Sequence, residues 1–400
     1  MLQASPRGQA GSKRCRGEDA LQSVLAARRE ALGMNHAETL QAAMDVVDYL
    51  TEHDKFDEAE DLLHKVVMAR DATLGEDHAD TMQARHALVQ CLVAQKKYTP
   101  AEDILHNLVQ ARRDRLGEDH ADTMQARHAL AQCLLAQKKY TSAEDILDGL
   151  VQVCRDRLGK DHAETMQARH ALAQCLIAQK KYTSAEDILD GLVQSRRDRL
   201  GEDHADTRAS TLQLAEVLSL QGDPAEAARL QRGVLALDRR RLGADDPQTL
   251  VTENALAHYL AGQGALDQAV ETHRRVLAAR ERVLGQDSAD TWRSMGDLAE
   301  CLRAQGWYEE EEAVLRRLWV AYARVHGERG EETLLQAEQV ALCLARQEDY
   351  ARAVQVALDV LLKRQAVLGA GHAQTQRAAE LFRVYSERVA AVSLKNDLEN

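Results

Sequence analysis

The sequence predicts an all-α solenoid of stacked helical hairpins, because three residue types recur in phase along most of its length. A glycine recurs every 42 residues, a threonine stands six residues after it, and a leucine stands seventeen residues after it. Self-similarity at a fixed period of this size is typical of repeat architectures. The glycines are Gly33, Gly75, Gly117, Gly159, Gly201, Gly243, Gly285, Gly327 and Gly369; the threonines are Thr39, Thr81, Thr123, Thr165, Thr207, Thr249, Thr291, Thr333 and Thr375; the leucines are Leu50, Leu92, Leu134, Leu176, Leu218, Leu260, Leu302 and Leu344.

Composition agrees with helices. The chain has 400 residues but only four prolines, two phenylalanines and three tryptophans, and strong helix formers dominate it. In chain order we expect a lone helix at about 19–32, eight full helix pairs from Gly33 to Leu368, and a closing helix at about 372–390. The two single helices cap the ends, which gives about 18 helices in one solenoid over residues 19–390.

Each repeat contains two amphipathic helices. In the second repeat, Leu88, Cys91 and Leu92 form one apolar stripe, and the residues after Pro100 form another with helical spacing. Thr99 and Glu102 form a capping box that predicts the start of the second helix, and Gly117 predicts its end. One face of each pair stays apolar, so we expect neighbouring pairs to bury it between them.

The two ends have a different character. Residues 1–17 contain four cations, no acid and no apolar core of a signal peptide, so we expect a disordered basic tail over 1–18, with a transit peptide as the alternative. Residues 391–400 are expected to form a flexible tail. Seven cysteines without an export signal indicate free thiols and a cytoplasmic location. Five cysteines share one repeat position and are predicted core residues: Cys91, Cys133, Cys175, Cys301 and Cys343.

Several functional classes are disfavoured. The formal net charge of −13 does not suit nucleic-acid binding, and no stretch approaches the 18 apolar residues of a membrane helix. Catalysis needs one asymmetric set of reactive groups, whereas the polar residues here are copied from repeat to repeat. We therefore expect no enzyme, no cofactor and no metal site. The histidines at 78, 120, 162 and 204 lack metal-ligand spacing and are predicted to serve the turn or to cap a helix.

The repeat resembles the tetratricopeptide repeats of kinesin light chains and their relatives. The matching residues in one unit are Leu116-Gly117, His120, Thr123, Leu130-Ala131, Lys139-Tyr140 and Ala143-Glu144. The resemblance covers about 20–390 and implies a right-handed α-solenoid whose first helices line a concave groove for a protein partner. It names kinesin heavy chain as one conceivable partner. The family's usual groove amide is retained here at Asn254.

Candidate groove residues lie on the first helices, away from the apolar stripe. They comprise Gln83, His86, Gln90, Gln125, His128, Gln132, Gln167, His170, Gln174 and Asn254. Three stacked sets of amides and imidazoles are able to hydrogen-bond a peptide or a helix of another protein. The alternative is an ordinary solvated face, copied by recent duplication. The lysine pairs at 96–97, 138–139 and 180–181 either attract an acidic partner or are simply solvated.

The predicted function is a protein-interaction scaffold. Two alternatives stay open: the sensor or assembly arm of a larger signalling protein, and a kinesin light chain-like cargo adaptor. The sequence does not name the partner or the oligomeric state.

Overall fold

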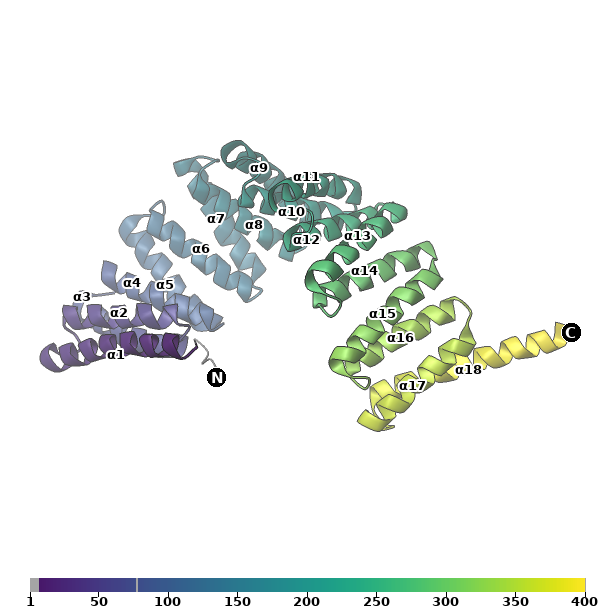
Figure 1. Cartoon of the computed structure of the whole chain (residues 1–400). Coiled ribbons are helices and arrows are strands. Elements are labelled where there is room, and N and C mark those ends of the chain that lie inside the picture. The colour runs from purple at the N-terminus through teal and green to yellow at the C-terminus, as the bar shows by residue number, and fades with distance from the viewer. Residues whose placement is uncertain (1–6, 77, 400) are drawn as a thin grey trace. The chain divides into compact units, whose positions relative to one another are not determined.

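The computed structural model describes residues 7–76 and 78–399, with side chains described from 18 to 76 and from 78 to 392. This part of the chain contains eighteen helices and no strand (Figure 1), which confirms the predicted all-α solenoid. The chain divides into two compact units, one ending at Glu202 (unit 1) and one beginning at Asp203 (unit 2). Each unit is described by itself below.

First and second helices alternate along both units, after an initial helix α1 (Arg7–Leu32). The first helices of the pairs are α2 (Ala37–Glu52), α4 (Ala79–Ala94), α6 (Ala121–Ala136), α8 (Ala163–Ala178), α10 (Ala205–Leu220), α12 (Pro247–Gly262), α14 (Ala289–Gln305) and α16 (Glu331–Arg346), followed by the closing helix α18 (Ala373–Glu399). The second helices are α3 (Phe56–Leu74), α5 (Tyr98–Leu116), α7 (Tyr140–Leu158), α9 (Tyr182–Leu200), α11 (Pro224–Leu242), α13 (Leu266–Leu284), α15 (Tyr308–His326) and α17 (Tyr350–Leu368).

The helices at the ends are longer than the sequence predicted. Helix α1 begins at Arg7, so residues 7–18, expected in a disordered tail, are helical; the expectation for residues 1–6 lies outside the described residues. Helix α18 runs to Glu399, past the expected end near residue 390. Neither extension contains a proline to stop a helix. Residues 7–18 include four Lys or Arg residues, which favour helix, and also three glycines, which do not.

The repeat glycine and the repeat threonine act together in the turn between successive repeats. Each repeat glycine ends a second helix with a positive φ, as at Gly75 with φ 89° and Gly159 with φ 89°, where a side chain would be strained. In four repeats the threonine hydroxyl donates to the glycine carbonyl, for example from Thr81 to Gly75 over 2.9 Å and from Thr165 to Gly159 over 2.8 Å. The six-residue spacing therefore closes the turn between repeats.

Histidines begin the first helices as predicted. The Nδ1 atoms of His78, His120, His162 and His204 each accept the backbone N–H two residues on, which satisfies one of the unpaired N–H groups at a helix start. The capping box expected for the second helix was wrong. Helix α5 starts at Tyr98 with Lys97 as its N-cap, and no side chain caps it.

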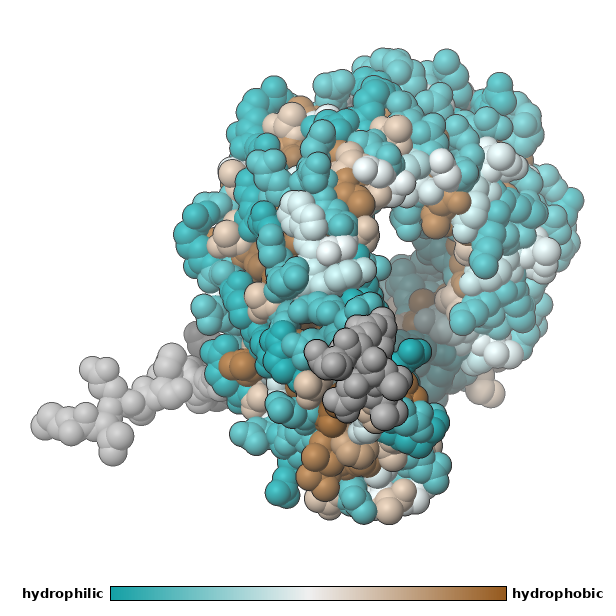
Figure 2. All heavy atoms as spheres, turned by 90° about the vertical axis from the view of Figure 1, so that its right-hand side faces the viewer, coloured by the Kyte–Doolittle hydropathy of each residue, from teal (hydrophilic) through white to brown (hydrophobic). Residues whose placement is uncertain are grey.

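The leucine and cysteine columns lie in the core. The repeat leucines have exposed fractions between 0 and 8%, and all six cysteines with described side chains are free and buried. Burial raises the pKa of the Cys301 thiol to about 11 and that of Cys343 to about 12, so both stay protonated and behave as small apolar groups. Polar residues cover most of the face seen in Figure 2, and apolar side chains appear there only in separate groups.

A second polar column joins four of the second helices to the first helix that follows each of them. The arginines at 70, 112, 280 and 364 are buried, and each donates to the backbone carbonyl ten residues on, at 2.6 to 3.2 Å. Thirty residues before each of these arginines, on the first helix of the same pair, the sequence has Met or Leu.

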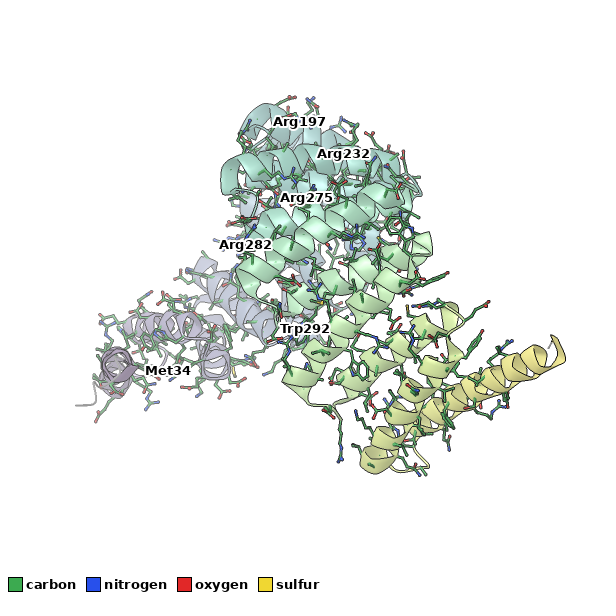
Figure 3. All side chains as sticks on the ribbon, turned by 45° about the vertical axis from the view of Figure 1, so that its right-hand side comes forward. Met34, Arg197, Arg232, Arg275, Arg282 and Trp292 are labelled. Atoms are coloured by element: carbon green, nitrogen blue, oxygen red, sulfur yellow. The ribbon has the colours of Figure 1, made fainter. Side chains whose placement is uncertain are left out.

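Three repeats replace the arginine, and two of them also replace the Met or Leu beside it. Cys154 Sγ lies 3.4 Å from the sulfur of Met124 in unit 1. In unit 2, Arg208 donates from Nε and Nη2 to both carboxylate oxygens of Asp238, at 2.8 and 2.9 Å. The ring of Trp292, labelled in Figure 3, packs in a tilted arrangement on Tyr322, with 4.4 Å between the ring centroids. The same place in the repeat therefore accepts a sulfur pair, an ion pair or an aromatic pair.

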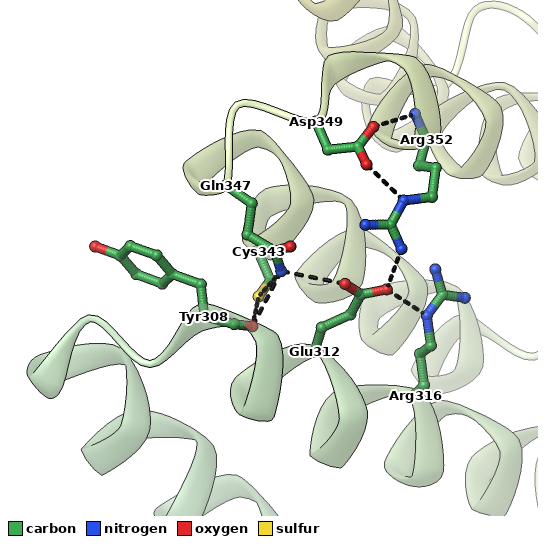
Figure 4. A network of polar contacts seen from close by, with 7 residues as sticks. All are labelled: Tyr308, Glu312, Arg316, Cys343, Gln347, Asp349 and Arg352. Carbon is green, nitrogen blue, oxygen red and sulfur yellow. Dashed lines mark hydrogen bonds and ion pairs between the residues drawn. The ribbon is translucent and has the colours of Figure 1, made fainter.

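Hydrogen bonds also join a second helix to the turn between the two helices of the next repeat. Glu102 accepts from Lys139 Nζ at 2.6 Å and from Gln137 Nε2 at 2.6 Å, both one repeat further on. The bond from Lys139 lowers the pKa of Glu102. Figure 4 shows the same position in unit 2, where Glu312 accepts from Gln347 over 3.1 Å and from Arg316 and Arg352 over 2.8 and 3.0 Å. The glutamate that the sequence assigned to a capping box thus joins two repeats.

The ion pair between Arg208 and Asp238 gives a first prediction. Replacing the buried Asp238 by Leu leaves the largely buried guanidinium of Arg208 without its carboxylate and is expected to lower the free energy of unfolding by about 3 kcal/mol. The double variant with Arg208→Met, the residue of the preceding repeats, is expected to recover most of that loss. Urea unfolding followed by circular dichroism measures both effects.

The matched control is Arg240→Met, which removes a surface pair to Asp203 at 2.9 Å whose side chains are 69% and 61% exposed. That change is expected to cost under about 1 kcal/mol. If the single Asp238→Leu variant and the double variant lost the same free energy of unfolding, the ion pair would not be what stabilises this contact.

Candidate functional site

Unit 1 contains a cavity of about 800 Å3 lined mainly by three consecutive first helices, α4, α6 and α8. Its size lies within the range of ordinary ligand sites. Leu150 and Cys154 of α7 and Tyr98 of α5 complete the wall. Most of the wall is apolar, and the polar lining comes from residues that repeat from helix to helix.

Six of the ten predicted groove residues line this cavity: His86, Gln90, Gln125, His128, Gln132 and Gln167. Gln83 is exposed on α4 but is not part of the wall, and His170 and Gln174 lie further along α8. Asn254 belongs to unit 2. The structure thus brings the central part of the predicted ladder together.

Each histidine of the ladder is bonded to the glutamine one turn later on its own helix. The distances between the two Nε2 atoms are 3.2 Å for His86 and Gln90, 3.0 Å for His128 and Gln132, and 3.1 Å for His170 and Gln174. A glutamine nitrogen only donates, so each histidine Nε2 accepts. The glutamine oxygen and its second N–H remain for other partners, and the imidazole fixes their direction.

The two histidines in the cavity are uncharged at neutral pH. Burial, helped by the nearby Arg112 guanidinium, lowers the pKa of His86, and burial lowers the pKa of His128. A neutral ring that accepts at Nε2 carries its proton on Nδ1. In His86 this Nδ1 is buried without a hydrogen-bond partner among the described residues.

The charged residues of the cavity wall are both acids. Asp122 and Glu164 stand in the first turns of α6 and α8, and neither lysine nor arginine lines the wall. The helix dipole stabilises negative charge at this position. The carboxylate of Asp122 lies 3.8 Å from His120 Nδ1, but that nitrogen accepts the Asp122 N–H and so presents a lone pair rather than a cation.

The lysine pairs separate into two roles. Lys97, Lys139 and Lys181 bind Glu60, Glu102 and Glu144 of the preceding repeat at 2.6 to 2.7 Å. The other members, at positions 96, 138 and 180, adopt positive φ values of 61° to 62° in the turn between the two helices of a pair, with exposed side chains. The predicted attraction of an acidic partner stays a prediction for these three.

Comparison with known proteins identifies the family. The tetratricopeptide repeat profile matches residues 39–80, 80–148, 122–198, 164–240, 206–282, 248–318 and 333–374. The chain belongs to the tetratricopeptide repeat family. Proteins of this family bind other proteins. No curated protein matches the sequence.

Solved structures with similar folds share little sequence with this tetratricopeptide repeat chain. A putative kinesin light chain from Podosopora anserina with nearly identical TPR-like repeats has 23% identity, covering 50% of this chain and 95% of that one, with a TM-score of 0.47. A signal transduction ATPase with a tetratricopeptide repeat sensor from Pyrococcus horikoshii has 11% identity, covering 93% of this chain and 54% of that one, with a TM-score of 0.54. These likenesses concern the fold.

Among the tetratricopeptide repeats of unit 2, a polar network surrounds Asn254. Asn254 donates to Asp297 at 2.8 Å, and its oxygen lies 3.1 Å from His273 Nδ1. His258 lies 3.4 Å from the same aspartate, which raises the pKa of His258. Asn254 is only 7% exposed, so its amide is part of the core rather than a free groove group.

Unit 2 also has its own cavity of about 720 Å3, which sequence reasoning missed. Arg208, Gln231 and Thr252 line it, at positions where the repeats of unit 1 hold Met, Leu and Ala. Polar residues at repeat positions that are apolar in unit 1 are a signal in the sequence that could have indicated this cavity. Sequence reasoning also missed Cys154 and Leu150 of the first cavity. The sequence signal there is weaker: Cys154 stands where the adjoining repeats have arginine.

Two absences apply to the described residues. No three His, Cys, Asp or Glu side chains among them come close enough to hold a metal ion. None of the described helices combines the length and apolar composition needed to cross a bilayer.

The buried His273 gives a second prediction. Burial, helped by the neighbouring His258, lowers its pKa from 6.5 to about 4, so the unfolded chain binds the proton first as the pH falls. Above about pH 6.5 His273 does not change the free energy of unfolding. Between about pH 6.5 and 4 it lowers the free energy of unfolding of unit 2 progressively. By pH 5 the loss is expected to reach about 2 kcal/mol.

The measurement compares urea unfolding of the native chain and a His273→Leu variant at pH 7 and pH 5. Leucine occupies this column in unit 1, at Leu105, Leu147 and Leu189. The variant is expected to lose less stability on acidification than the native chain. An identical pH dependence would contradict the assignment to His273.

Proposed function

We propose that this tetratricopeptide repeat chain is a protein-interaction scaffold whose unit 1 cavity binds a peptide or helical segment of another protein. One observation carries the proposal: glutamine and histidine side chains from consecutive repeats line the same cavity. Chemically identical groups at a regular spacing suit a polypeptide, because a peptide backbone also presents its donors and acceptors at regular intervals.

The glutamines are the proposed contacts and the histidines position them. Gln90 and Gln132 are exposed and keep a free oxygen and one N–H after bonding to their histidines. A fixed amide loses less side-chain entropy on binding than a freely rotating one. Gln125 and Gln167 contribute from the neighbouring turn of α6 and α8.

The remaining parts of the proposal follow from the same features. A repeated set of amides offers no nucleophile with an adjoining base, so the proposed role is binding without catalysis, and it includes neither nucleic acid nor membrane as a partner. Buried, protonated thiols suit a reducing compartment, which supports a cytoplasmic location. Roles as a sensor arm or as a kinesin-linked adaptor remain alternatives, because likeness at 11 to 23% identity concerns the fold alone.

The test replaces the ladder in two ways. A triple Gln90→Ala, Gln125→Ala, Gln132→Ala variant removes three of the proposed contacts, and a double His86→Ala, His128→Ala variant removes the groups that orient Gln90 and Gln132. Three lost hydrogen bonds of at least about 0.5 kcal/mol each weaken binding about tenfold or more. The histidine variant is expected to show the smaller loss. Quantitative pull-down of cellular partners measures both.

A matched control exists on the second helices. Gln110 and Gln152 are exposed and hydrogen-bonded to the aspartate one turn later, and Gln194 has the same bond to Asp198. Replacing these three by alanine removes the same chemistry away from the cavity and is expected to leave partner capture unchanged. Helical circular dichroism should match in all variants. An unchanged partner set in both ladder variants would remove this groove assignment.

A further inference from the structure

The cavity of unit 2 has apolar side chains at the repeat positions where unit 1 has its ladder. Leu212 stands in the column of the ladder histidines, and Val251 stands in the column of the first ladder glutamine. Val251 is 56% exposed, Leu284 beside the same cavity is 38% exposed, and Leu212 is half-buried. We call these three side chains the apolar wall. Unit 2 therefore offers apolar surface at the place where unit 1 offers amides and imidazoles.

The buried lining of the cavity, in contrast, is polar. It consists of Arg208, Gln231 and Thr252, and the last two are only 2% exposed. The guanidinium of Arg208 donates to Asp238 at 2.8 and 2.9 Å and to the Thr252 hydroxyl at 3.0 Å. Asp238 and Arg208 thus neutralise each other, and this lining needs no counter-ion from a ligand.

Two amide oxygens at the cavity have no donor within the described chain. Gln231 Nε2 donates to the Thr252 carbonyl at 2.9 Å, and because a carbonyl only accepts, this bond fixes which end of the amide is nitrogen. No described residue donates to the Gln231 oxygen. The side-chain oxygen of Gln213 is buried without a hydrogen-bond partner. The ladder repeats of unit 1 have leucine and alanine at these two positions, so both acceptors belong to this cavity alone.

The charges around the cavity disfavour a charged ligand of either sign. Two cations and two acids line it: Arg208, Arg280, Glu216 and Asp290. A charged side chain that entered would approach a like charge in a partly desolvated space, which costs binding energy. An uncharged ligand avoids this cost. A ligand that also donates N–H groups satisfies the two amide oxygens.

We infer that the cavity of unit 2 is a second binding site, which takes an uncharged polypeptide segment that carries an apolar side chain. The apolar side chain packs against the apolar wall, and backbone N–H groups beside it donate to the oxygens of Gln231 and Gln213. A polypeptide supplies both features, because each residue except proline carries an N–H next to its side chain. This site goes beyond the proposed function, since its chemistry differs from that of the unit 1 cavity and binding there is not required.

The experiment uses the full chain with the unit 1 glutamines already replaced, as Gln90→Ala, Gln125→Ala and Gln132→Ala, so that unit 2 is measured by itself. Three fluorescent peptide pools of one length share the same randomised apolar positions, and their remaining positions are Ser/Thr, Asp/Glu or Lys/Arg. Fluorescence anisotropy is expected to show the uncharged pool binding at least about tenfold tighter than either charged pool. Its affinity should change by less than about twofold with ionic strength, because apolar contacts are not screened.

A matched pair of variants tests the apolar wall. Leu212→His with Val251→Gln installs the residues of the unit 1 ladder, so it should fold, and it should weaken binding of the uncharged pool about tenfold or more. The control, Leu358→His with Leu362→Gln, makes the same chemical changes on α17, outside the cavity, at residues that are 38% and 56% exposed. It should leave binding unchanged, and circular dichroism should match in both. An equal loss in the control would contradict the inference.

A third variant tests the amide oxygen. Gln231→Leu installs the leucine of the unit 1 repeats and makes the cavity more apolar, yet loss of the acceptor should weaken the uncharged pool about fivefold. Unchanged or tighter binding would contradict the role of Gln231. Equal binding of all three pools, or no binding of the uncharged pool, would overturn the second site. Either result would leave the proposed function of unit 1 to its own test.

Discussion

The packing of each second helix against the first helix that follows is the contact on which the rest of the structure depends. A single hairpin buries one face only, so the core is completed by the next hairpin. Here that contact is fastened by a buried arginine, a threonine-to-glycine hydrogen bond and an inter-repeat glutamate, all in register. Any side chain that changes this contact changes the surface beside it.

The same contact links stability to the proposed site. At position 154 the arginine is replaced by a cysteine, which is one of the residues that line the cavity of the glutamine and histidine ladder. At Asp238 the charge is reversed and pairs with Arg208, which lines a different cavity in unit 2. The two units therefore carry cavities whose polar linings differ: glutamine, histidine and acids in unit 1, and arginine, glutamine and threonine among others in unit 2.

Much of the fold could be predicted from sequence, because the 42-residue columns record backbone requirements directly. Gly75 needs a positive φ, Thr81 reaches back to its carbonyl, and Leu92 lies in the core. Glu102 was misassigned because a local pattern, threonine followed three residues later by glutamate, competes with partners 35 and 37 residues away. A capping box is a local hypothesis, and the stacking of repeats overrode it.

The candidate site was only partly predictable, for a related reason. The ladder is visible as a repeated column, so His86, His128 and their glutamines could be named, but their mutual hydrogen bonds follow from the helix geometry. Asn254 was grouped with them by family resemblance. In unit 2, however, His273 replaces a leucine and Asp297 replaces an alanine of the unit 1 repeats. Both side chains hydrogen-bond to Asn254. Cavities arise from the loss of volume at single positions, which periodicity does not reveal.

Hydrogen exchange of the full chain, with and without a captured partner, tests the central claim most directly. If the stacked first helices of unit 1 grip a polypeptide, amides of α4, α6 and α8 should gain protection on binding, with the largest gain around Gln125 to Gln132. Unchanged exchange in these three helices, with protection gained elsewhere in the chain, would contradict it.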